Sequence, residues 1–474
     1  MATSARKLVW PTGRKALWLV WLPGYLLCGA GFLLCVVSFY PGYISPDSIR
    51  QLSEGRAWSF TDWHPPLMAA VWGIVDRFIP GPAGMLLLHN AAFWGALGLF
   101  WRETYRRSVW LGLSLVVIGF LPTTLALLST IWKDVGFGVS LLSASALLYT
   151  ARQTNSRGAL LGSLPLLFYG YGVRQNAAPA ILPLALWTGS VACRVFPSIR
   201  RRVGSSYRSL PFVLGLACFL CLTVAVLTTT WILTGGRSSY LLQTVLLHDL
   251  TAISKERGEA LFPDYILRDE GFSLEKASTL YQPYIATPVI EGRGSGLKLT
   301  EDPLEITALR AKWLEVVAAN KGVYLRHRWE AFKWATGYGV EHVCFPYLAT
   351  SHRFGGYDVN ERRIHQFLRA LFWKLRDTFF FRGFVWLLLS FVLLCRASVG
   401  RLRDDLEPVF VLSLSGFLYG VAYFFFATSC DFRFFWWTAL ASLVSLCFAV
   451  SFEAGRMRTR RAAAVKSQSK SQMS

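Results

Sequence analysis

Residues 43–66 read YISPDSIRQLSEGRAWSFTDWHPP and follow directly on a long apolar run. The stretch carries six ionisable and three aromatic side chains: Asp47, Arg50, Glu54, Arg56, Asp62 and His64, with Trp58, Phe60 and Trp63. Charged groups are expensive inside a bilayer unless they are paired or used in function. We therefore expect this stretch to form a first loop outside the membrane, and we expect the chemistry of the protein to be carried there.

The composition places the chain among membrane proteins. It has 474 residues, of which 53% are hydrophobic and 16% are charged, whereas soluble domains carry roughly 25% charged residues. Apolar runs of about 18 to 25 residues recur, which is long enough to cross a hydrocarbon core of about 30 Å. We predict an all-α polytopic membrane protein with about ten transmembrane helices. No cleavable signal peptide is evident, because the first run lacks a small-residue cleavage pattern.

The formal net charge of +21 is concentrated in short loops. This distribution fits the positive-inside rule, and it argues for membrane topology and against a nucleic-acid partner. The basic clusters lie at residues 6–15, 102–107, 152–157, 194–208, 396–403 and 456–470. Both termini are therefore predicted to be cytoplasmic, and the alternate loops are predicted to be extracytoplasmic, hereafter the outer face.

Ten apolar runs are read as membrane spans. Seven of them lie at residues 16–39, 83–100, 109–127, 135–150, 158–171, 177–193 and 209–234, and three more at 383–395, 408–427 and 434–452. Residues 67–79 are also apolar, but at about 1.5 Å per residue they reach only about 20 Å. They also contain Asp76 and Arg77, so we predict a helix that lies at the outer interface.

These spans divide the chain into four parts. Residues 1–234 form an N-terminal module of seven spans with an outer loop at 40–82. Residues 235–381 are polar and too long for a connector, so we predict an extracytoplasmic helical domain. Residues 382–455 form a segment of three spans, and residues 456–474 form a basic cytoplasmic tail that we predict to be disordered.

The predicted topology isolates a small set of charges. When the inner loops and the long polar segment are set aside, the remaining charges all fall at the outer face. The basic ones are Arg50, Arg56, Arg77, Lys133, Arg174 and Arg433, and the acidic ones are Asp47, Glu54, Asp62, Asp76, Asp134 and Asp431. Several lie within a few residues of a span, where a charge is costly unless it is paired or functional.

Two residues of the first outer loop are candidates for chemistry. Asp47 follows Pro46, and its carboxylate is suited to deprotonate a hydroxyl as a general base. The alternative is that Asp47 is the N-cap of a helix that continues through Leu52. His64 stands before two prolines, where it either binds a phosphate or a sugar hydroxyl or acts as a structural hydrogen-bonding group.

Three further outer turns carry candidates. Lys133 and Asp134 either share the cavity of Asp47, with Lys133 facing a phosphate, or are a snorkelling lysine beside a capping aspartate. The run Arg174-Gln175-Asn176 suits a phosphate or a polyol, and its alternative is a structural loop. In the last outer turn, Arg433 either faces the same cavity or pairs with Asp431. The aromatic residues around that turn are typical of an interfacial belt.

The nine cysteines show no metal-ligand spacing. Cys344 and Cys430 are both predicted at the outer face, where they either pair with one another or remain free thiols. The sequence has no phosphate-cradling glycine loop, no Ser/His/Asp set and no dinucleotide fingerprint. We therefore predict no chemistry that uses cytoplasmic nucleotides.

At these residues the chain resembles the GT-C superfamily of integral membrane glycosyltransferases, which includes protein O-mannosyltransferases and lipid A aminoarabinose transferases. The resemblance covers about residues 16–234. It rests on three motifs in chain order: Asp47 in the first outer loop, HPP at residues 64–66 before an interfacial helix, and Lys133-Asp134 in the next outer turn. The first loop departs from the family pattern because it has no adjacent acidic pair, so a divalent metal is not supported and no cofactor is predicted.

The resemblance implies that a sugar is transferred from a polyprenyl-phosphate donor to a hydroxyl of a glycan, lipid or protein. The transfer would take place at the outer face of a plasma or inner membrane and would invert the anomeric carbon. The implied roles are catalysis by Asp47, the general base, and Asp134; contacts to the donor phosphate by Lys133, Arg174 and Arg433; and substrate contacts by His64, Gln175 and Asn176.

Two alternatives use the same outer charges. A transporter or flippase for lipid-linked saccharides would use the cationic cavity without bond chemistry. A surface polysaccharide polymerase would rely on arginines and leave Asp47 dispensable. The long outer segment and the order of the aspartate motifs favour the transferase, and neither mid-membrane charges nor twofold internal similarity favour a transporter.

Overall fold

The computed structural model describes residues 14–198, 209–290, 295–348, 356–359, 361–399 and 406–471. Within these ranges the chain is helical, and its only β-type pairings are isolated bridges. The predicted basic N-terminus at residues 1–13 and the basic residues 200–202 and 401–403 of two inner loops lie outside the described residues.

Seven helices of the described chain are long and apolar enough to cross a membrane. They are α1 (Arg14–Phe39), α4 (Ala83–Thr104), α7 (Lys133–Thr154), α9 (Ala178–Val195), α11 (Leu210–Thr234), α20 (Glu407–Phe426) and α21 (Trp436–Ser471). The prediction of a polytopic helical membrane protein is thereby confirmed, because such helices satisfy their own backbone hydrogen bonds in lipid.

The remaining predicted spans are shorter or bent. The third is α5 (Val109–Val117) and the short η1 (Ile118–Phe120) followed by α6 (Pro122–Leu128), with a bend of 54° at the break. The fifth and the eighth are α8 (Arg157–Gly172) and α19 (Gly383–Val399), of 16 and 17 residues. The total of ten spans therefore stays a prediction.

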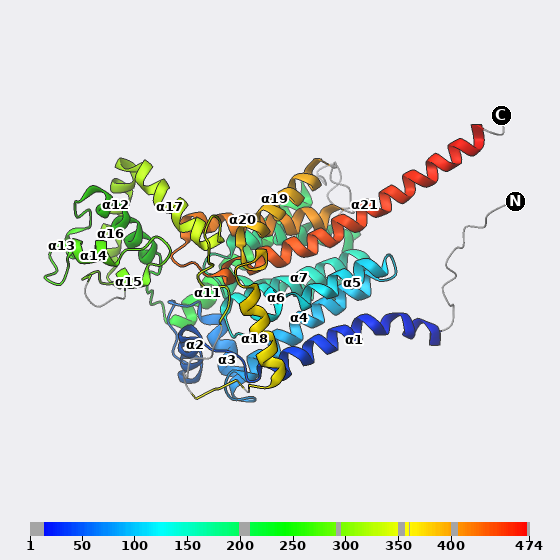
Figure 1. Ribbon diagram of the computed structural model, residues 1–474, viewed down its shortest axis with the longest axis horizontal. Helices are drawn as coiled ribbons and strands as arrows, with labels where there is room; N and C mark the ends of the chain where they lie inside the picture. Colours follow the sequence, from blue (N-terminus) through cyan, green and yellow to red (C-terminus); the bar gives the residue numbers. More distant parts are fainter. Residues whose placement is uncertain are drawn as a thin grey trace.

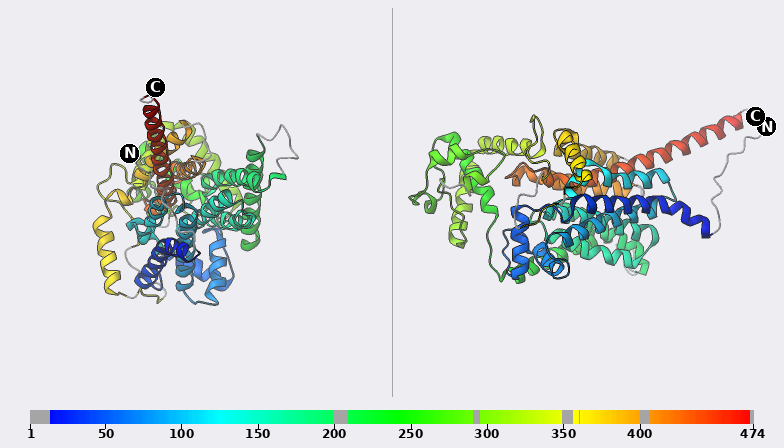
Figure 2. Two further views of the ribbon diagram at one scale, coloured as in Figure 1. Left: turned by 90° about the vertical axis from the view of Figure 1, so that its right-hand side faces the viewer. Right: turned by 60° about the horizontal axis from the view of Figure 1, so that its bottom comes forward.

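The arrangement of the helices separates two ends of the bundle (Figure 1). At one end lie α2 (Pro46–Ala57) and α3 (Pro66–Asp76), and the helices α12 to α16 extend beyond that same end. The start of α1 and the end of α21 lie at the opposite end, as the further views also show (Figure 2). This arrangement is compatible with the predicted topology, in which both termini share one side and the polar segment lies on the other.

The helix α7 lies at the centre of the bundle. Within its apolar window 94% of the residues are buried, against 11% for α11, which therefore lies at the periphery. Fully buried indole rings at Trp72, Trp187 and Trp436 help to fill the core around α7. The predicted span at 135–150 begins two residues earlier in the structure, so that Lys133 and Asp134 form the first turn of α7.

The quoted stretch folds into two short helices that pack closely on one another. Ser45 caps α2, and its hydroxyl exchanges capping-box hydrogen bonds with Ser48. Pro46 occupies the first helical turn, where its missing N–H costs nothing. A Cβ built on Gly55 of α2 would lie 2.4 Å from the carbonyl oxygen of Ala69, and one on Gly73 of α3 would lie 2.4 Å from that of Gly55. The two helices can approach this closely only because both positions lack side chains.

The polar segment 235–381 is not one domain. A separate hydrophobic core joins α12 (Leu242–Arg257), α13 (Asp264–Leu267), α14 (Leu274–Leu280), α15 (Thr287–Ile290), α16 (Pro303–Ala319) and the start of α17 (Lys321–Thr336). We call residues 242–336 the loop domain. By contrast, α18 (Arg363–Leu375) packs on the bundle, where His365 accepts or donates a hydrogen bond at 2.5 Å to Tyr43 and Phe372 stacks on Phe39.

The tail also differs from the prediction. We expected residues 456–474 to be disordered, but α21 continues through Ser471. The reason lies in the composition of residues 456–466, RMRTRRAAAVK, in which Arg, Ala, Met and Lys are strong helix formers. Once a helix has been nucleated by the buried part of α21, its extension needs only favourable propensity.

The contact between α2 and α3 gives a first testable prediction. Gly73→Ala should destabilise the protein by about 1 to 3 kcal/mol, because the added methyl group would overlap the backbone of α2. Gly95→Ala in α4 is the matched control, since a Cβ there meets nothing within 4 Å. Thermal unfolding in detergent should separate the two variants, and equal midpoints would refute the close packing of α2 on α3.

Candidate functional site

Six of the predicted site residues meet at the end of the bundle where α2 lies. They come from α2, the loop before α3, the first turn of α7, the turn between α8 and α9, and the 3-10 helix η5 (Phe432–Phe435). Contacts between side chains connect all six, which are Asp47, His64, Lys133, Asp134, Arg174 and Arg433. We call these six residues, together with Asp431, the charge cluster.

The start of α2 is attached directly to the segment that precedes α7. Tyr43 forms a backbone bridge with Thr130, in which the amide of Ile131 donates to the Tyr43 oxygen at 2.9 Å. The Ser48 hydroxyl donates to the carbonyl oxygen of Ile131 at 2.7 Å, and the Trp132 indole N–H donates to Ser45 at 2.9 Å. These bonds place the first turn of α2 beside the first turn of α7.

The alternative in which Asp47 caps a helix is wrong. Ser45 is the N-cap of α2, and Asp47 is the second residue of the helix, with its carboxylate in the first turn. A carboxylate at that position still interacts favourably with the helix dipole. It is free of a capping hydrogen bond, however, and faces Arg433, whose Nη1 lies 3.2 Å from Asp47 Oδ2.

Arg433 connects three carboxylates from three parts of the chain. Besides Asp47, its guanidinium lies 3.9 Å from Asp134 Oδ2 and 3.4 Å from Asp431 Oδ2. The guanidinium carbon stands 4.5 Å from the ring centre of Trp132, which is cation–π distance. The sequence left open whether Arg433 faces the cavity or pairs with Asp431, and in the structure it does both.

Asp134 and Arg174 form a buried ion pair beneath Asp47. Arg174 Nη1 lies 2.7 Å from Asp134 Oδ1, and the two side chains are 8% and 1% exposed. Arg174 also donates a hydrogen bond to the Tyr423 hydroxyl, which in turn contacts the hydroxyl of Tyr419 at 3.1 Å. Asp134 is thus inaccessible to a substrate, and it acts on the site only through the arginines that it holds.

Lys133, His64 and Asp47 follow one another in a line. The Lys133 ammonium donates to His64 Nδ1 at 2.9 Å, so the ring proton resides on Nε2, which lies 3.9 Å from Asp47 Oδ1. Burial, followed by the charge of Lys133, lowers the pKa of His64 to about 2. His64 is therefore a neutral imidazole at physiological pH and orients its Nε2–H toward Asp47.

The two outermost aspartates titrate in opposite directions. Burial raises the pKa of Asp431, and the nearby carboxylates of Asp134 and Asp47 add to this effect against Arg433. Burial also opposes ionisation of Asp47, but the charges of Arg433, His64 and Lys133 outweigh it and lower the pKa of Asp47. The side chain of Asp47 is 33% exposed, against 11% for Asp431 and 1% for Asp134. Asp47 is consequently the ionised carboxylate of the cluster that a substrate can reach.

Gln175 and Asn176 have separate positions. The Gln175 amide donates to the backbone oxygen of Asp62 at 2.8 Å, so it holds the first outer loop against the turn between α8 and α9. The carboxylate of Asp62 accepts hydrogen bonds from Ser238 and Ser239, which follow α11. Asn176 instead hydrogen-bonds Tyr423 beside Arg174 and so belongs with the buried pair.

Tyr419, Tyr423 and Trp132 complete the site, and the sequence analysis gave them no role in it. The two tyrosines are four residues apart on α20, which places their hydroxyls on one helix face. That spacing near the outer end of a predicted span is a signal that could have identified them. Among the described residues, no group of three or more His, Cys, Asp or Glu side chains is arranged to hold a metal ion.

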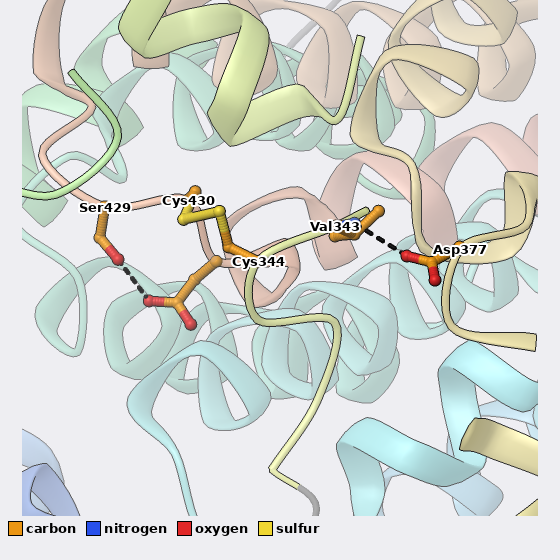
Figure 3. The surroundings of a disulfide bond; sticks show 6 residues. Val343, Cys344, Asp377, Ser429 and Cys430 are labelled. Carbon is orange, nitrogen blue, oxygen red and sulfur yellow. Dashed lines mark hydrogen bonds between the residues drawn. A yellow bond between two sulfur atoms is a disulfide. The ribbon is translucent and has the colours of Figure 1, made fainter. Parts of the chain in front are cut away.

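A disulfide between Cys344 and Cys430 closes the outer side of the cluster (Figure 3). The sequence left this pairing open. Cys430 immediately precedes Asp431, whose carboxylate accepts a hydrogen bond from Ser429 at 2.8 Å. The disulfide therefore joins the segment that follows the loop domain to the turn that carries Asp431 and Arg433.

Comparisons of the chain with protein-family models, with curated proteins and with solved structures find no match. The function must therefore be inferred from the side chains and their geometry.

The buried pair gives a second testable prediction. Asp134→Asn or Arg174→Gln should each cost about 3 to 5 kcal/mol of unfolding free energy, because each leaves the partner buried without its counter-charge. The double variant should cost clearly less than the sum of the two single ones. The exposed pair Asp264 and Arg268, neutralised in the same way, is the matched control and should leave the unfolding midpoint unchanged. Additive losses at Asp134 and Arg174 would contradict the pairing.

Proposed function

We propose that the protein transfers a sugar from a polyprenyl-phosphate donor to a hydroxyl acceptor at the outer membrane surface, with Asp47 as the general base. One observation carries the proposal. At the end of a bundle of apolar helices, a reachable ionised carboxylate lies within ion-pair distance of a cationic group. A lipid-linked donor would present its phosphate at this depth, next to the cations, and its sugar to the solvent beyond.

Asp47 has the chemistry that the first half of the reaction needs. An acceptor hydroxyl is a poor nucleophile at neutral pH, and a positioned base that takes its proton accelerates attack by about 100 to 10,000-fold. Arg433 keeps Asp47 ionised, although the same ion pair makes the carboxylate a weaker base. The Nε2–H of His64 points to the other oxygen of Asp47 and helps to orient it.

The cations serve the leaving group. The acceptor oxygen would form a bond to the anomeric carbon while the bond from that carbon to the phosphate oxygen breaks, and the hydroxyl proton would pass to Asp47. The negative charge that develops on the lipid phosphate is stabilised by fixed positive groups. Lys133 is the best placed to touch the phosphate, because Arg174 is buried against Asp134 and Arg433 is shared among three carboxylates.

The disulfide supports an extracytoplasmic site. Disulfides persist in oxidising compartments and are rare in the cytosol, and the Cys344–Cys430 bond adjoins the charge cluster. This agrees with the predicted topology, in which the first outer loop, the loop domain and the last outer turn share one side of the membrane. We place the reaction at the extracytoplasmic face of a plasma or inner membrane, where polyprenyl-phosphate sugars are the available donors.

The role of Asp47 can be tested directly. Asp47→Asn should abolish transfer from a synthetic polyprenyl-phosphate sugar while the unfolding midpoint stays near that of the wild type, because asparagine keeps the shape but cannot accept the proton. Glu275→Gln is the matched control, since it removes an acid from the first turn of α14 in the loop domain. In the wild type, kcat/KM should stay level from about pH 7 down to about pH 5, because the pKa of Asp47 is held below its usual value of about 3.9.

The outcomes distinguish the transferase from its alternatives. Transfer by Asp47→Asn within a few-fold of the wild type would eliminate the general-base role. Movement of labelled lipid-linked saccharide across vesicles without any bond change would indicate a transporter, and chain elongation that is indifferent to Asp47 would indicate a polymerase.

The donor contact gives a further prediction. Lys133→Met keeps the length of the side chain but removes its charge, so the KM for the donor should rise roughly tenfold to a hundredfold, with a smaller change for the acceptor. Lys276→Met, at an exposed lysine of the loop domain, is the control. An unchanged KM for the donor in steady-state assays would remove Lys133 from the phosphate site.

A further inference from the structure

The turn that carries Arg433 is held from outside the bundle. Residues 427–433 connect the end of α20 to η5, and their own helices constrain them only at the two ends. Four attachments reach the turn from elsewhere: Arg328 Nη1 to the Ala427 oxygen at 3.0 Å, the Ala286 amide to the Thr428 oxygen at 2.9 Å, the disulfide from Cys344 to Cys430, and the Phe432 amide to the Phe345 oxygen at 3.0 Å. The turn thus joins the loop domain to the charge cluster.

The Cys344 side of the disulfide is itself well anchored. Arg382, which directly precedes α19, donates hydrogen bonds to the backbone oxygens of Gly337, Val340 and Glu341 at 2.7 to 3.0 Å. The amide of Val343 donates to the Asp377 carboxylate at 2.9 Å (Figure 3). The segment that presents Cys344 is therefore fixed to the base of α19, so that the disulfide ties the turn to a rigid support.

The loop domain supplies the second anchor through a buried charge. Arg328 and Asp249 are both 0% exposed and lie 2.5 Å apart. The same carboxylate contacts His327 Nε2 at 3.1 Å and accepts a hydrogen bond from Trp313 at 2.9 Å. Because these groups are buried in the loop domain, Arg328 cannot swing away from Ala427 without exposing an unpaired charge to an apolar core.

We propose that the Cys344–Cys430 disulfide is a positioning element that holds the Arg433 guanidinium between Asp47 and Asp134 during transfer. Two residues separate Cys430 from Arg433, so that a covalent anchor at Cys430 leaves the guanidinium little freedom of position. Catalytic groups lose activity when they are displaced by about 1 Å. This inference rests on the proposed function for its effect on activity, but its structural part does not depend on any substrate.

Loss of the anchor has a defined electrostatic consequence. If Arg433 moves away, Asp47 keeps only Lys133 from α7 and the neutral His64 from the loop before α3 as close partners, while Asp134 and Asp431 lose a shared counter-charge. Burial of Asp47 remains, so its pKa rises. As the base must be ionised, activity would then be lost at a higher pH than in the wild type.

The structural part is tested by hydrogen–deuterium exchange of the full chain in lipid nanodiscs. The double variant Cys344→Ser/Cys430→Ser should exchange faster in residues 427–435 than the wild type, because the turn opens more often. Cys221→Ser/Cys395→Ser, at two exposed free cysteines, is the matched control and should exchange like the wild type. If the first variant does not fold, phosphine reduction of the folded wild type replaces it. Unchanged exchange in residues 427–435 would overturn the proposal, whatever the activity of the protein.

The activity part separates positioning from general stability. The double variant should lose roughly tenfold in kcat with little change in the KM for the donor. The acidic limb of its pH profile should shift to higher pH, in the same direction as that of Arg433→Gln. A lower yield of enzyme with an unshifted pH profile would mean that the disulfide is only structural and would overturn the proposal. Failure of the wild type to transfer any sugar would refute the proposed function and leave the exchange result to stand alone.

Discussion

The charge cluster depends on one side chain, the guanidinium of Arg433. Arg433 lies within ion-pair distance of Asp47, Asp134 and Asp431, and it is separated from Asp47 by 386 positions in the chain. Three carboxylates this close together repel one another and are costly to bury, so the arrangement exists only because Arg433, Arg174 and Lys133 compensate them. Assembly of the last outer turn onto the N-terminal half is therefore a condition for a stable site.

The first turn of α7 is where the membrane bundle and the outer loops meet. The helix is almost entirely buried, and its first two residues are Lys133 and Asp134. The tightly capped α2 is joined to the preceding segment by the bridge from Tyr43 to Thr130, which brings Asp47 to the same level. The depth of each member follows: Asp134 lies inside the protein, where it orders the arginines, whereas Asp47 lies at the rim, where a substrate reaches it.

The loop domain has its own core, yet its attachments end on the turn that carries Arg433. Arg328 at Ala427 and Cys344 at Cys430 reach the turn from two directions. A domain that folded independently and touched the bundle only through flexible linkers would leave Arg433 free to turn toward solvent. The polar segment thus contributes to the site by limiting motion, although its own residues lie outside the charge cluster.

The sequence alone determined the class of the protein, most of the apolar helices and the residues of the charge cluster. Apolar length sets a span through the cost of unsatisfied backbone in lipid, and the loop charges then place Asp47, Lys133 and Arg433 at one face. Pairing, depth and capping were decided by the tertiary structure alone. Ser45, not Asp47, caps α2, the polar segment divides between a loop domain and the bundle, and Tyr419 joins Arg174. Those outcomes depend on distances between segments far apart in the chain, which local propensity and hydrophobic periodicity do not encode.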